Sequence, residues 1–350
     1  MSPLQLVVPG PIEQRTGGYI YDRRIVEGLR AAGLAVAVHE LAGAFPKVDE
    51  AARRAAARAL EAMPRPALPV IDGLALPAFA DLTRRLPQPW VALVHHPLAL
   101  ETGLSPAEAR AFAGLERRLL ADATRLVVTS EATRRDLAGY GIEDRRIGVV
   151  RPGTDPAPLA SGSGGPGLAL LCVASLTPRK GHLVLLEALA TLRTLDWRLT
   201  CVGSALRDPA CARAIAMACE RLGLRARVEL AGEHPEAGLE RYYDGADLFV
   251  LASYHEGYGM VLAEALARGL PVVATTAGAI PETVPDGAGL LVAPGDPQAL
   301  AAALRRAMTE PELRAELIAG ARAARRGLPG WDDAARAFAA ELAGLARRAA

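Results

Sequence analysis

The chain has 350 residues, of which 51% are hydrophobic and 23% are charged, and its formal net charge is +1. This length exceeds one ordinary domain and fits two, and the apolar content excludes a disordered chain. The balanced charge gives no indication of nucleic-acid binding, and no stretch of about 18 apolar residues could span a membrane. Residues 1–4 lead directly into a strand-like run without a basic region, so we expect no secretory signal and a cytoplasmic protein.

Residue types that are rare in the chain, and motifs that it lacks, limit the kinds of binding site that it can contain. Arginine supplies nearly all of the 40 basic residues, so a retained lysine, Lys47 or Lys180, suggests a place that needs a compact ammonium group. The cysteines form no C-x-x-C pair and have no histidine at ligand spacing, so free thiols are expected rather than a disulfide or a zinc site. D-x-D, H-E-x-x-H and Walker lysine motifs are absent too, which predicts no metal. The cysteines are Cys172, Cys201, Cys211 and Cys219.

Short apolar runs alternate with helical patterns in the first half of the chain. Most runs are continuously apolar, as expected of buried parallel strands. The expected strands are residues 5–9, 36–41, 68–71, 91–94, 126–129 and 147–150. The expected helices are residues 19–32, 49–63, 106–122 and 132–139, and Ser105 and Glu108 form a capping box at the start of the third.

The composition changes at residues 152–167, which are rich in proline, glycine and serine and predict a flexible linker that does not pack. The alternation then restarts. The expected strands are residues 168–173, 199–202, 228–231, 248–251, 272–275 and 290–292. The expected helices are residues 181–193, 209–222, 260–268 and 297–308, and a last amphipathic helix begins at Trp331.

Strand–helix alternation that occurs twice predicts an α/β protein with two Rossmann-like, doubly wound domains. We place the first domain at residues 1–155, a linker at 156–167, the second domain at 168–330 and a terminal helix at 331–350. Ligands of such folds bind beyond the carboxyl ends of the strands, so the cleft between two facing domains is the expected site.

Two motifs follow strands of the first domain. Gly17 and Gly18 open a helix after the first strand, where backbone amides can meet an anion, although a plain strand–helix turn explains them equally well. A dinucleotide site also stays open, with Glu40 nearest to the acidic position, but the G-x-G-x-x-G fingerprint is incomplete. His95 and His96 follow the strand at 91–94, where an imidazole can transfer a proton or stabilise charge. The alternative is a structural histidine that caps the next turn.

Two further motifs lie in the second domain. Arg179 and Lys180 open a helix after the strand at 168–173, and a cationic pair there suits a diphosphate, the alternative being ordinary solvated charges. Glu256 precedes a glycine-containing loop, a helix begins near residue 260, and Glu264 lies about one turn inside it. The two carboxylates are thus spread along a ligand groove rather than paired across one bond as in a glycosidase. A glycine-rich turn with surface glutamates is the alternative.

These residues resemble the family-4 glycosyltransferases, retaining enzymes of the GT-B fold, over nearly the whole chain. Residues 247–274, with Glu256 and Glu264, are similar to the E-x7-E block of that family. The similarity continues in segments 278–282, 287–292 and 294–296, and in 127–130 through 150–155, which is similar to the family's domain junction.

The resemblance implies a role for each motif. Glu256 would lie beside the transferred sugar, Glu264 would hold the ribose hydroxyls and Lys180 would bind phosphate. His95 would approach the sugar and the reacting centre, and the adjacent His96 leaves open which of the two acts. The sugar and the diphosphate would be contacted by the backbone amides of Gly17, Gly18, Gly257, Tyr258, Gly259, Met260 and Val261. The helix at 331–350 would pack back on the first domain.

One departure affects the phosphate site. The family commonly has Gly-Arg about five residues before the lysine, and this chain has Ala174 and Ser175 there. Arg179 is a differently placed substitute for the missing cation.

The resemblance implies transfer of a sugar from a UDP-, GDP- or other nucleoside diphosphate sugar, with retention and with neither a metal nor a cofactor. A GT-B sugar-nucleotide epimerase or phosphorylase, a two-lobed binding protein and a dinucleotide-dependent dehydrogenase are the rival interpretations. The acceptor is expected to be a small molecule or glycan. Arg53, Arg54 and Arg58 could touch an anionic membrane, but a solvated helix face is favoured because the opposite side is nearly all alanine. The sequence does not indicate an oligomeric state.

Overall fold

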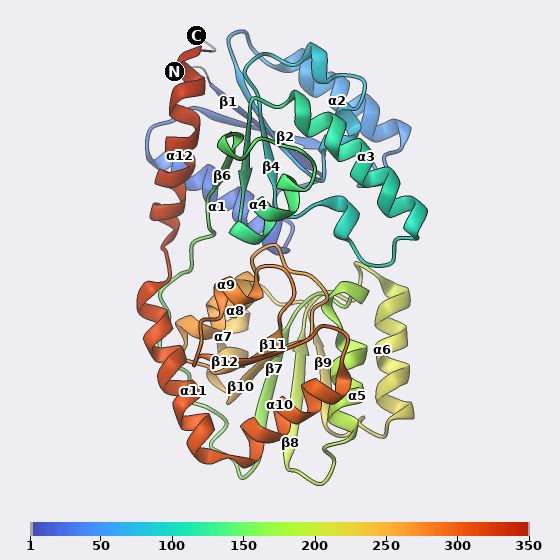
Figure 1. Ribbon diagram of the computed structural model, residues 1–350, viewed down its shortest axis with the longest axis vertical. Helices are drawn as coiled ribbons and strands as arrows, with labels where there is room; N and C mark the ends of the chain where they lie inside the picture. Colours follow the sequence, from blue (N-terminus) through green and yellow to red (C-terminus); the bar gives the residue numbers. More distant parts are fainter. Residues whose placement is uncertain (1–2, 349–350) are drawn as a thin grey trace. The chain divides into compact units, whose positions relative to one another are not determined.

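The computed structural model describes residues 3–348, so the last two residues of the predicted terminal helix lie outside the described residues. The chain forms two compact units (Figure 1). Unit 1 comprises residues 1–153 together with 329–350, and unit 2 comprises residues 154–328. Each unit contains one six-stranded parallel sheet with helices around it, so the chain has the predicted α/β class with two doubly wound units.

The sheet of unit 1 has the order β2-β1-β3-β4-β5-β6. Its strands are β1 (Leu4–Pro9), β2 (Val36–Leu41), β3 (Leu68–Asp72), β4 (Val91–Val94), β5 (Arg125–Val128) and β6 (Ile147–Val149). The helices are α1 (Gly17–Ala31), α2 (Glu50–Ala62), α3 (Pro106–Asp122), α4 (Glu131–Ala138) and α12 (Trp331–Arg348), with short 3-10 turns η1 (Leu76–Phe79), η2 (Thr83–Arg85), η3 (Leu98–Leu100) and η4 (Asp144–Arg146). The predicted capping box of Ser105 and Glu108 is present at the start of α3.

Helices on unit 1 pack with small side chains. On α2 the alanine side is buried in the core, and Arg53, Arg54 and Arg58 are exposed on the other side. The last helix, α12, lies beside α1 (Figure 1), and a Cβ atom at Gly28 would come within 2.4 Å of the Cβ of Ala335. This contact has no room for a side chain, which lets the two helices approach closely.

The sheet of unit 2 has the order β12-β11-β10-β7-β8-β9. Its strands are β7 (Leu168–Val173), β8 (Trp197–Val202), β9 (Val228–Gly232), β10 (Leu248–Leu251), β11 (Val272–Thr275) and β12 (Gly289–Val292). Its helices are α5 (His182–Ala190), α6 (Pro209–Arg221), α7 (Glu236–Asp244), α8 (Met260–Ala267), α9 (Ile280–Thr283), α10 (Pro297–Thr309) and α11 (Pro311–Ala324), with 3-10 turns η5 (Pro178–Lys180) and η6 (Arg325–Gly327).

The proline-, glycine- and serine-rich segment differs from the unpacked linker expected from its composition. It has no regular secondary structure, but it is hydrogen-bonded along unit 2. Ala160 donates to the carbonyl of Arg268 at 2.9 Å, and Gly162 donates to the carbonyl of Asp244 at 2.8 Å. The hydroxyl of Ser163 donates to Asp247 at 2.6 Å. Composition predicted the absence of helix and strand, but partners distant in sequence fix the backbone.

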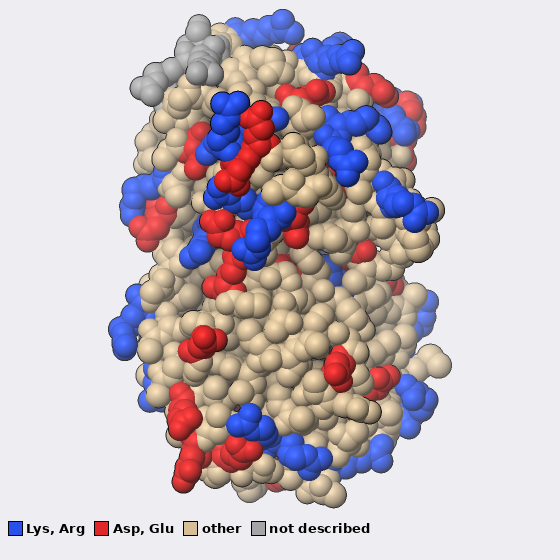
Figure 2. All heavy atoms as spheres, viewed as in Figure 1, with Lys and Arg blue, Asp and Glu red and all other residues tan. Residues whose placement is uncertain are grey.

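Charges of both signs are interspersed on the face of unit 1 seen in Figure 2, as the net charge of +1 suggests. No helix among the described residues is long and apolar enough to cross a membrane.

Candidate active site

In unit 1, the imidazole of His95 is held between two buried carboxylates. His95 directly follows β4, and its Nε2 atom lies 3.0 Å from Oδ1 of Asp22 on α1 and 3.1 Å from Oδ2 of Asp72 at the end of β3. Asp22 is 1% exposed and Asp72 is 3% exposed. The sheet order places β3 between β1 and β4, so Asp72, His95 and Asp22, on the helix that follows β1, meet beyond the carboxyl ends of these strands.

The charges in this cluster depend on one another. Burial alone would lower the pKa of His95, but attraction to Asp22 and Asp72 outweighs it and raises the pKa above its ordinary value. Burial raises the pKa of Asp22, and the neighbouring imidazole only partly opposes that rise. The ligand atoms of the three residues are also close enough to surround an ion. Nε2 already lies at hydrogen-bond distance from both carboxylates, so the imidazolium itself is the counter-ion of the pair.

The backbone and ring of His95 are fixed by further contacts. Its carbonyl accepts hydrogen bonds from the hydroxyls of Thr129 at 3.2 Å and Thr133 at 3.4 Å. The ring of Tyr21 packs edge-on against its imidazole, with centroids 5.3 Å apart. A Cβ atom at Gly18 would lie 3.2 Å from Cδ2 of His95, so this glycine lets the start of α1 pass close to the imidazole. The predicted residues Gly18 and His95 thus meet.

His96 is placed differently. Its Nε2 atom pairs with Glu101 at 3.3 Å, and both side chains are partly exposed. The loop that carries both histidines is held by buried Glu116, which accepts hydrogen bonds from the amides of Leu98 at 2.7 Å and Ala99 at 3.3 Å. Gly17 is exposed at the first position of α1, which has no side-chain cap.

We expect the imidazole of His95 to titrate well above the ordinary pKa of about 6.5, because both carboxylates stabilise its charged form. Burial lowers the pKa of His39, which provides an internal contrast. Proton–nitrogen NMR of the six histidines across pH measures both. The signal that disappears in the His95→Gln variant is assigned to His95. A pKa of His95 at or below about 6.5 would contradict the expected ion cluster.

In unit 2, two cations meet one buried carboxylate. The ammonium of Lys180 lies 2.5 Å from Oε1 of Glu256, and a guanidinium nitrogen of Arg179 lies 3.6 Å from Oε2. Ser253, which is fully buried, donates its hydroxyl to Oε1 of Glu256 at 2.6 Å. Arg179 also donates to the carbonyl of His255 at 2.8 Å. The substitute cation named from the sequence therefore lies beside the same carboxylate as the lysine.

Electrostatics of this cluster favour an ionised glutamate. Burial alone would raise the pKa of Glu256, but Lys180 and Arg179 outweigh it and lower the pKa to about 2. The pKa of Lys180 is lowered, because burial outweighs the attraction of Glu256. The net effect of the surroundings therefore differs between the two residues. The carboxylate of Glu256 is stabilised as an anion, whereas the charged form of the Lys180 ammonium is disfavoured. An added anion beside Lys180 would relieve that cost.

Two helices begin at this cluster without side-chain caps. Gly181 precedes α5 with a φ of +67°, and Gly259 precedes α8 with a φ of +87°. Met260 and Val261 are the first two residues of α8, and the loop before it contains Gly257 and Tyr258. Uncapped amino termini present amide groups and the positive end of the helix dipole. Together with Lys180 and Arg179 they form an environment suited to a phosphate anion.

Glu264 lies in α8 as predicted, and it contacts a different set of residues from Glu256. The hydroxyl of Tyr243 donates to its Oε2 atom at 2.7 Å, and Tyr243 is 1% exposed. Burial raises the pKa of Glu264, while Tyr243 and Arg268 partly oppose the rise. This carboxylate is therefore oriented by a fixed phenol, which the sequence analysis did not identify.

Gly181→Ala is expected to destabilise unit 2. An alanine Cβ at this position would lie 1.9 Å from the carbonyl oxygen of Ala252, in addition to the backbone cost of about 1–2 kcal/mol for positive φ. Gly141→Ala is the matched control, because its φ is +78° but nothing lies within 4 Å of the added Cβ. Urea unfolding of both variants measures the difference, and equal losses would show that the close approach to Ala252 is unimportant.

Two sequence models of known protein families match the chain. Residues 167–310 match the sequence model described as glycosyl transferases group 1, and residues 45–158 match the model described as glycosyltransferase family 4. D-inositol 3-phosphate glycosyltransferase from Frankia alni is 34% identical over 243 residues, which cover 63% of this chain and 59% of the relative. The corresponding protein from Kineococcus radiotolerans is 34% identical over 271 residues, covering 68% and 61%. The chain thus spans about three fifths of the length of these curated relatives.

Solved structures share the fold. Sucrose-phosphate synthase from Thermosynechococcus elongatus has a TM-score of 0.84 at 22% identity, with 99% of this chain and 100% of that chain covered. Anabaena HepE in complex with UDP-glucose has a TM-score of 0.79 at 20% identity, with the same coverage. None of these proteins is named an epimerase, so that alternative gains no support. With one domain model matching each half of the sequence and a GT-B fold throughout, the chain belongs to the family-4 glycosyltransferases.

Proposed function

We propose that this protein transfers a glycosyl group from a nucleoside diphosphate sugar to an acceptor hydroxyl, with retention of anomeric configuration and without a metal ion or cofactor. The observation that carries the proposal is the cluster of Lys180, Arg179 and Glu256 at the uncapped amino termini of α5 and α8. Cations and helix-end amides together supply the charge that a leaving diphosphate needs.

The donor site is assigned to unit 2. Lys180 and Arg179 bind the diphosphate, assisted by the amides of residues 257–261, and Glu256 contacts the transferred sugar. Glu264 accepts hydrogen bonds from the ribose, and Tyr243 holds it in place for that task. The pairing of Lys180 with Glu256 supports these assignments, because an ammonium fixed by a carboxylate can bind a phosphate without reorganising.

The reaction breaks the bond between the anomeric carbon and the phosphate oxygen, and forms a bond between that carbon and the acceptor oxygen on the same face. The acceptor proton passes to the leaving phosphate, whose developing charge Lys180 and Arg179 stabilise. In unit 1 we assign His95 rather than His96 to the reaction, because His95 is the one fixed by two buried carboxylates beside Gly18.

Names of similar proteins supply the first substrates to test. The structure of Anabaena HepE was solved with UDP-glucose, and the curated relatives are named D-inositol 3-phosphate glycosyltransferases. UDP-sugars are therefore the first donors to test, and D-inositol 3-phosphate is the first acceptor. A phosphorylated polyol is a small molecule, one of the two acceptor classes expected from the sequence.

Donor binding is tested by thermal unfolding with UDP, GDP, ADP and TDP and their sugars, in the wild type, Glu264→Ala and Glu187→Ala. Glu187 is an exposed residue of α5 and serves as the control. We expect one nucleotide to stabilise the wild type and the control, and to stabilise Glu264→Ala less. Stabilisation by dinucleotides or free sugars, with none by any nucleoside diphosphate, would overturn the proposal. NMR of the product then tests retention, and equal activity with and without added Mg²⁺ or Mn²⁺ tests whether the reaction is independent of a catalytic metal.

A further inference from the structure

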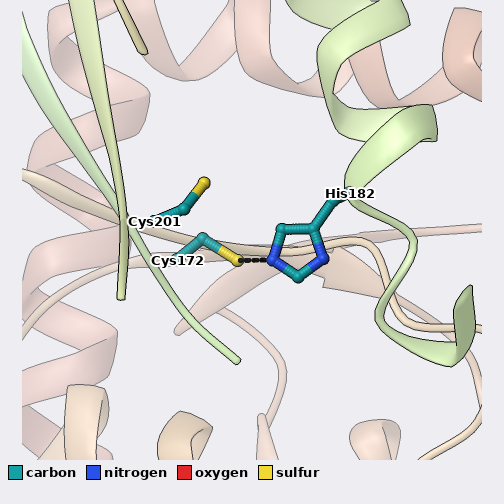
Figure 3. Close-up of side chains that lie close together, drawn as sticks. All are labelled: Cys172, His182 and Cys201. Atoms are coloured by element: carbon teal, nitrogen blue, oxygen red, sulfur yellow. Dashed lines mark hydrogen bonds between the residues drawn. The ribbon is translucent and has the colours of Figure 1, made fainter. Parts of the chain in front are cut away.

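Three side chains that can ligate a metal converge inside unit 2. Cys172 on β7 and Cys201 on β8 are direct partners in the parallel ladder, and His182 is the first residue of α5. Their exposed fractions are 1%, 3% and 3%, and one ligand atom from each lies within 4.8 Å of the others. Figure 3 shows the imidazole turned toward the sulfur of Cys172, with Cys201 beside it on the neighbouring strand.

The spacing of these atoms fits two ligands of one ion. Sγ of Cys172 lies 3.8 Å from Nε2 of His182. Ligands on a tetrahedral zinc ion, at about 2.3 Å for sulfur and about 2.0 Å for nitrogen, lie about 3.6 Å from each other. A disulfide fits less well, because neighbouring strands lie about 4.8 Å apart and a disulfide needs Cβ atoms at about 3.8 Å. Both cysteines are free thiols.

The burial of His182 is otherwise poorly compensated. Its Nδ1 atom is buried and has no hydrogen-bond partner among the described residues. Its one polar contact, through Nε2, is with a thiol, which is a weak hydrogen-bonding group. The contact through Nε2 is the one that bears on a metal, because Nε2 is the nitrogen beside Sγ of Cys172. Coordination of a metal through Nε2 would replace this weak contact with a strong bond, and the unpartnered Nδ1 would stay outside the site.

We infer that Cys172, His182 and Cys201 bind one Zn²⁺ ion as two thiolates and a neutral imidazole. Binding releases the two thiol protons to solvent, and the resulting site is neutral, which suits its apolar surroundings better than the net negative charge that Cu⁺ would leave. The described residues offer no fourth side-chain ligand in this cluster, so a water molecule completes the tetrahedron.

Such an ion would fix the start of α5. It would connect β7, β8 and the first residue of the helix, two positions after Lys180. Its role is structural, so the site does not depend on the glycosyltransferase activity proposed above. The site was not predicted from the sequence because its residues form no C-x-x-C pair or other familiar ligand spacing. The pairing of β7 with β8 brings the two cysteines together, and the start of α5 adds His182.

The test uses the full chain, reduced with a phosphine and stripped with a chelator. Cd²⁺ serves as the spectroscopic probe, and Zn²⁺ binding is followed by thermal unfolding. We expect a thiolate-to-Cd²⁺ charge-transfer band that saturates at one equivalent, and a higher Tm with Zn²⁺. Cys201→Ser and His182→Ala should lose both effects, whereas Cys211→Ser, which removes a thiol outside the cluster, should keep them.

Variants that fail to fold would not decide the matter, so X-ray absorption of the zinc-loaded wild type provides a second measurement. Two sulfur neighbours with nitrogen or oxygen in the remaining positions support the site. Coordination by nitrogen and oxygen alone, a band retained in both cluster variants, or binding of Cu⁺ but not Zn²⁺ would each overturn the inference.

Discussion

Lys180→Ala is expected to lower kcat/KM by about 10²–10³-fold, with weaker binding of the nucleoside diphosphate as well. The ammonium of Lys180 lies 2.5 Å from Glu256. Under the proposed function its loss removes stabilisation of the leaving group, and it leaves the buried carboxylate with Arg179 and the hydroxyl of Ser253 as neighbours. Steady-state kinetics with the donor found by thermal unfolding measures the change.

Two further variants sharpen this test. Lys47→Ala removes the other lysine of the chain, whose exposed ammonium pairs with Glu108, and it should leave kcat/KM unchanged. Lys180→Arg keeps the charge but replaces a point charge by a planar fork, and it should stay well below the wild type. Full activity in Lys180→Arg would show that the scarcity of lysine has no functional meaning at this position, and wild-type kinetics in Lys180→Ala would refute the phosphate role.

His95→Ala is expected to destabilise unit 1 by about 3–5 kcal/mol at neutral pH. The substitution leaves Asp22 and Asp72 buried next to each other without the imidazolium between them. The pKa of Asp22, which burial already raises, then rises further above its unfolded value near 4 because the imidazolium that opposed the rise is gone, and a carboxyl with a raised pKa is destabilising when ionised. The deficit should therefore be small near pH 4 and grow as the pH rises. Urea unfolding at several pH values measures it.

The matched control for that prediction is His96→Ala. His96 is partly exposed and pairs with a partly exposed glutamate, so its loss should cost no more than about 1 kcal/mol at any pH. Asp22→Asn placed in the His95→Ala background should restore part of the lost stability, since it removes one of the two opposed charges. A loss that is equal in both histidine variants, or independent of pH, would contradict the ion cluster.

The positions of the strands were predictable because each buried strand is a short run of apolar residues. Runs such as residues 248–251 are apolar throughout, and such runs form strands buried on both faces, as β10 does. Helix starts with explicit signals were predictable too, as at Ser105. Three helices were missed. α9 spans four residues, and α7 contains a glycine and few apolar residues, so neither shows a helical period. α11 spans 14 residues with a helical period and was nevertheless not predicted.

The site was predictable where residues stand next to a strand end, and not where tertiary packing decides their role. His95, Lys180 and Glu256 follow apolar strands, which sequence reveals directly. Asp22 looks like one member of a charged surface run, because Arg23 and Arg24 follow it, and only the rotation of α1 against the sheet buries it. Tyr243 likewise appears as an ordinary residue of a helix until α7 packs beside α8.

The return of α12 to unit 1 has a consequence for biosynthesis. When residues up to 328 have emerged from the ribosome, all of unit 2 has been synthesised, but unit 1 still lacks α12, the helix that lies against α1. The closely fitted face around Gly28 stays uncovered during that interval. Unit 2 can therefore complete its folding during translation, whereas the part of the protein made first is finished last. A stop codon just after residue 328 would leave the later-made unit intact and the earlier-made one incomplete.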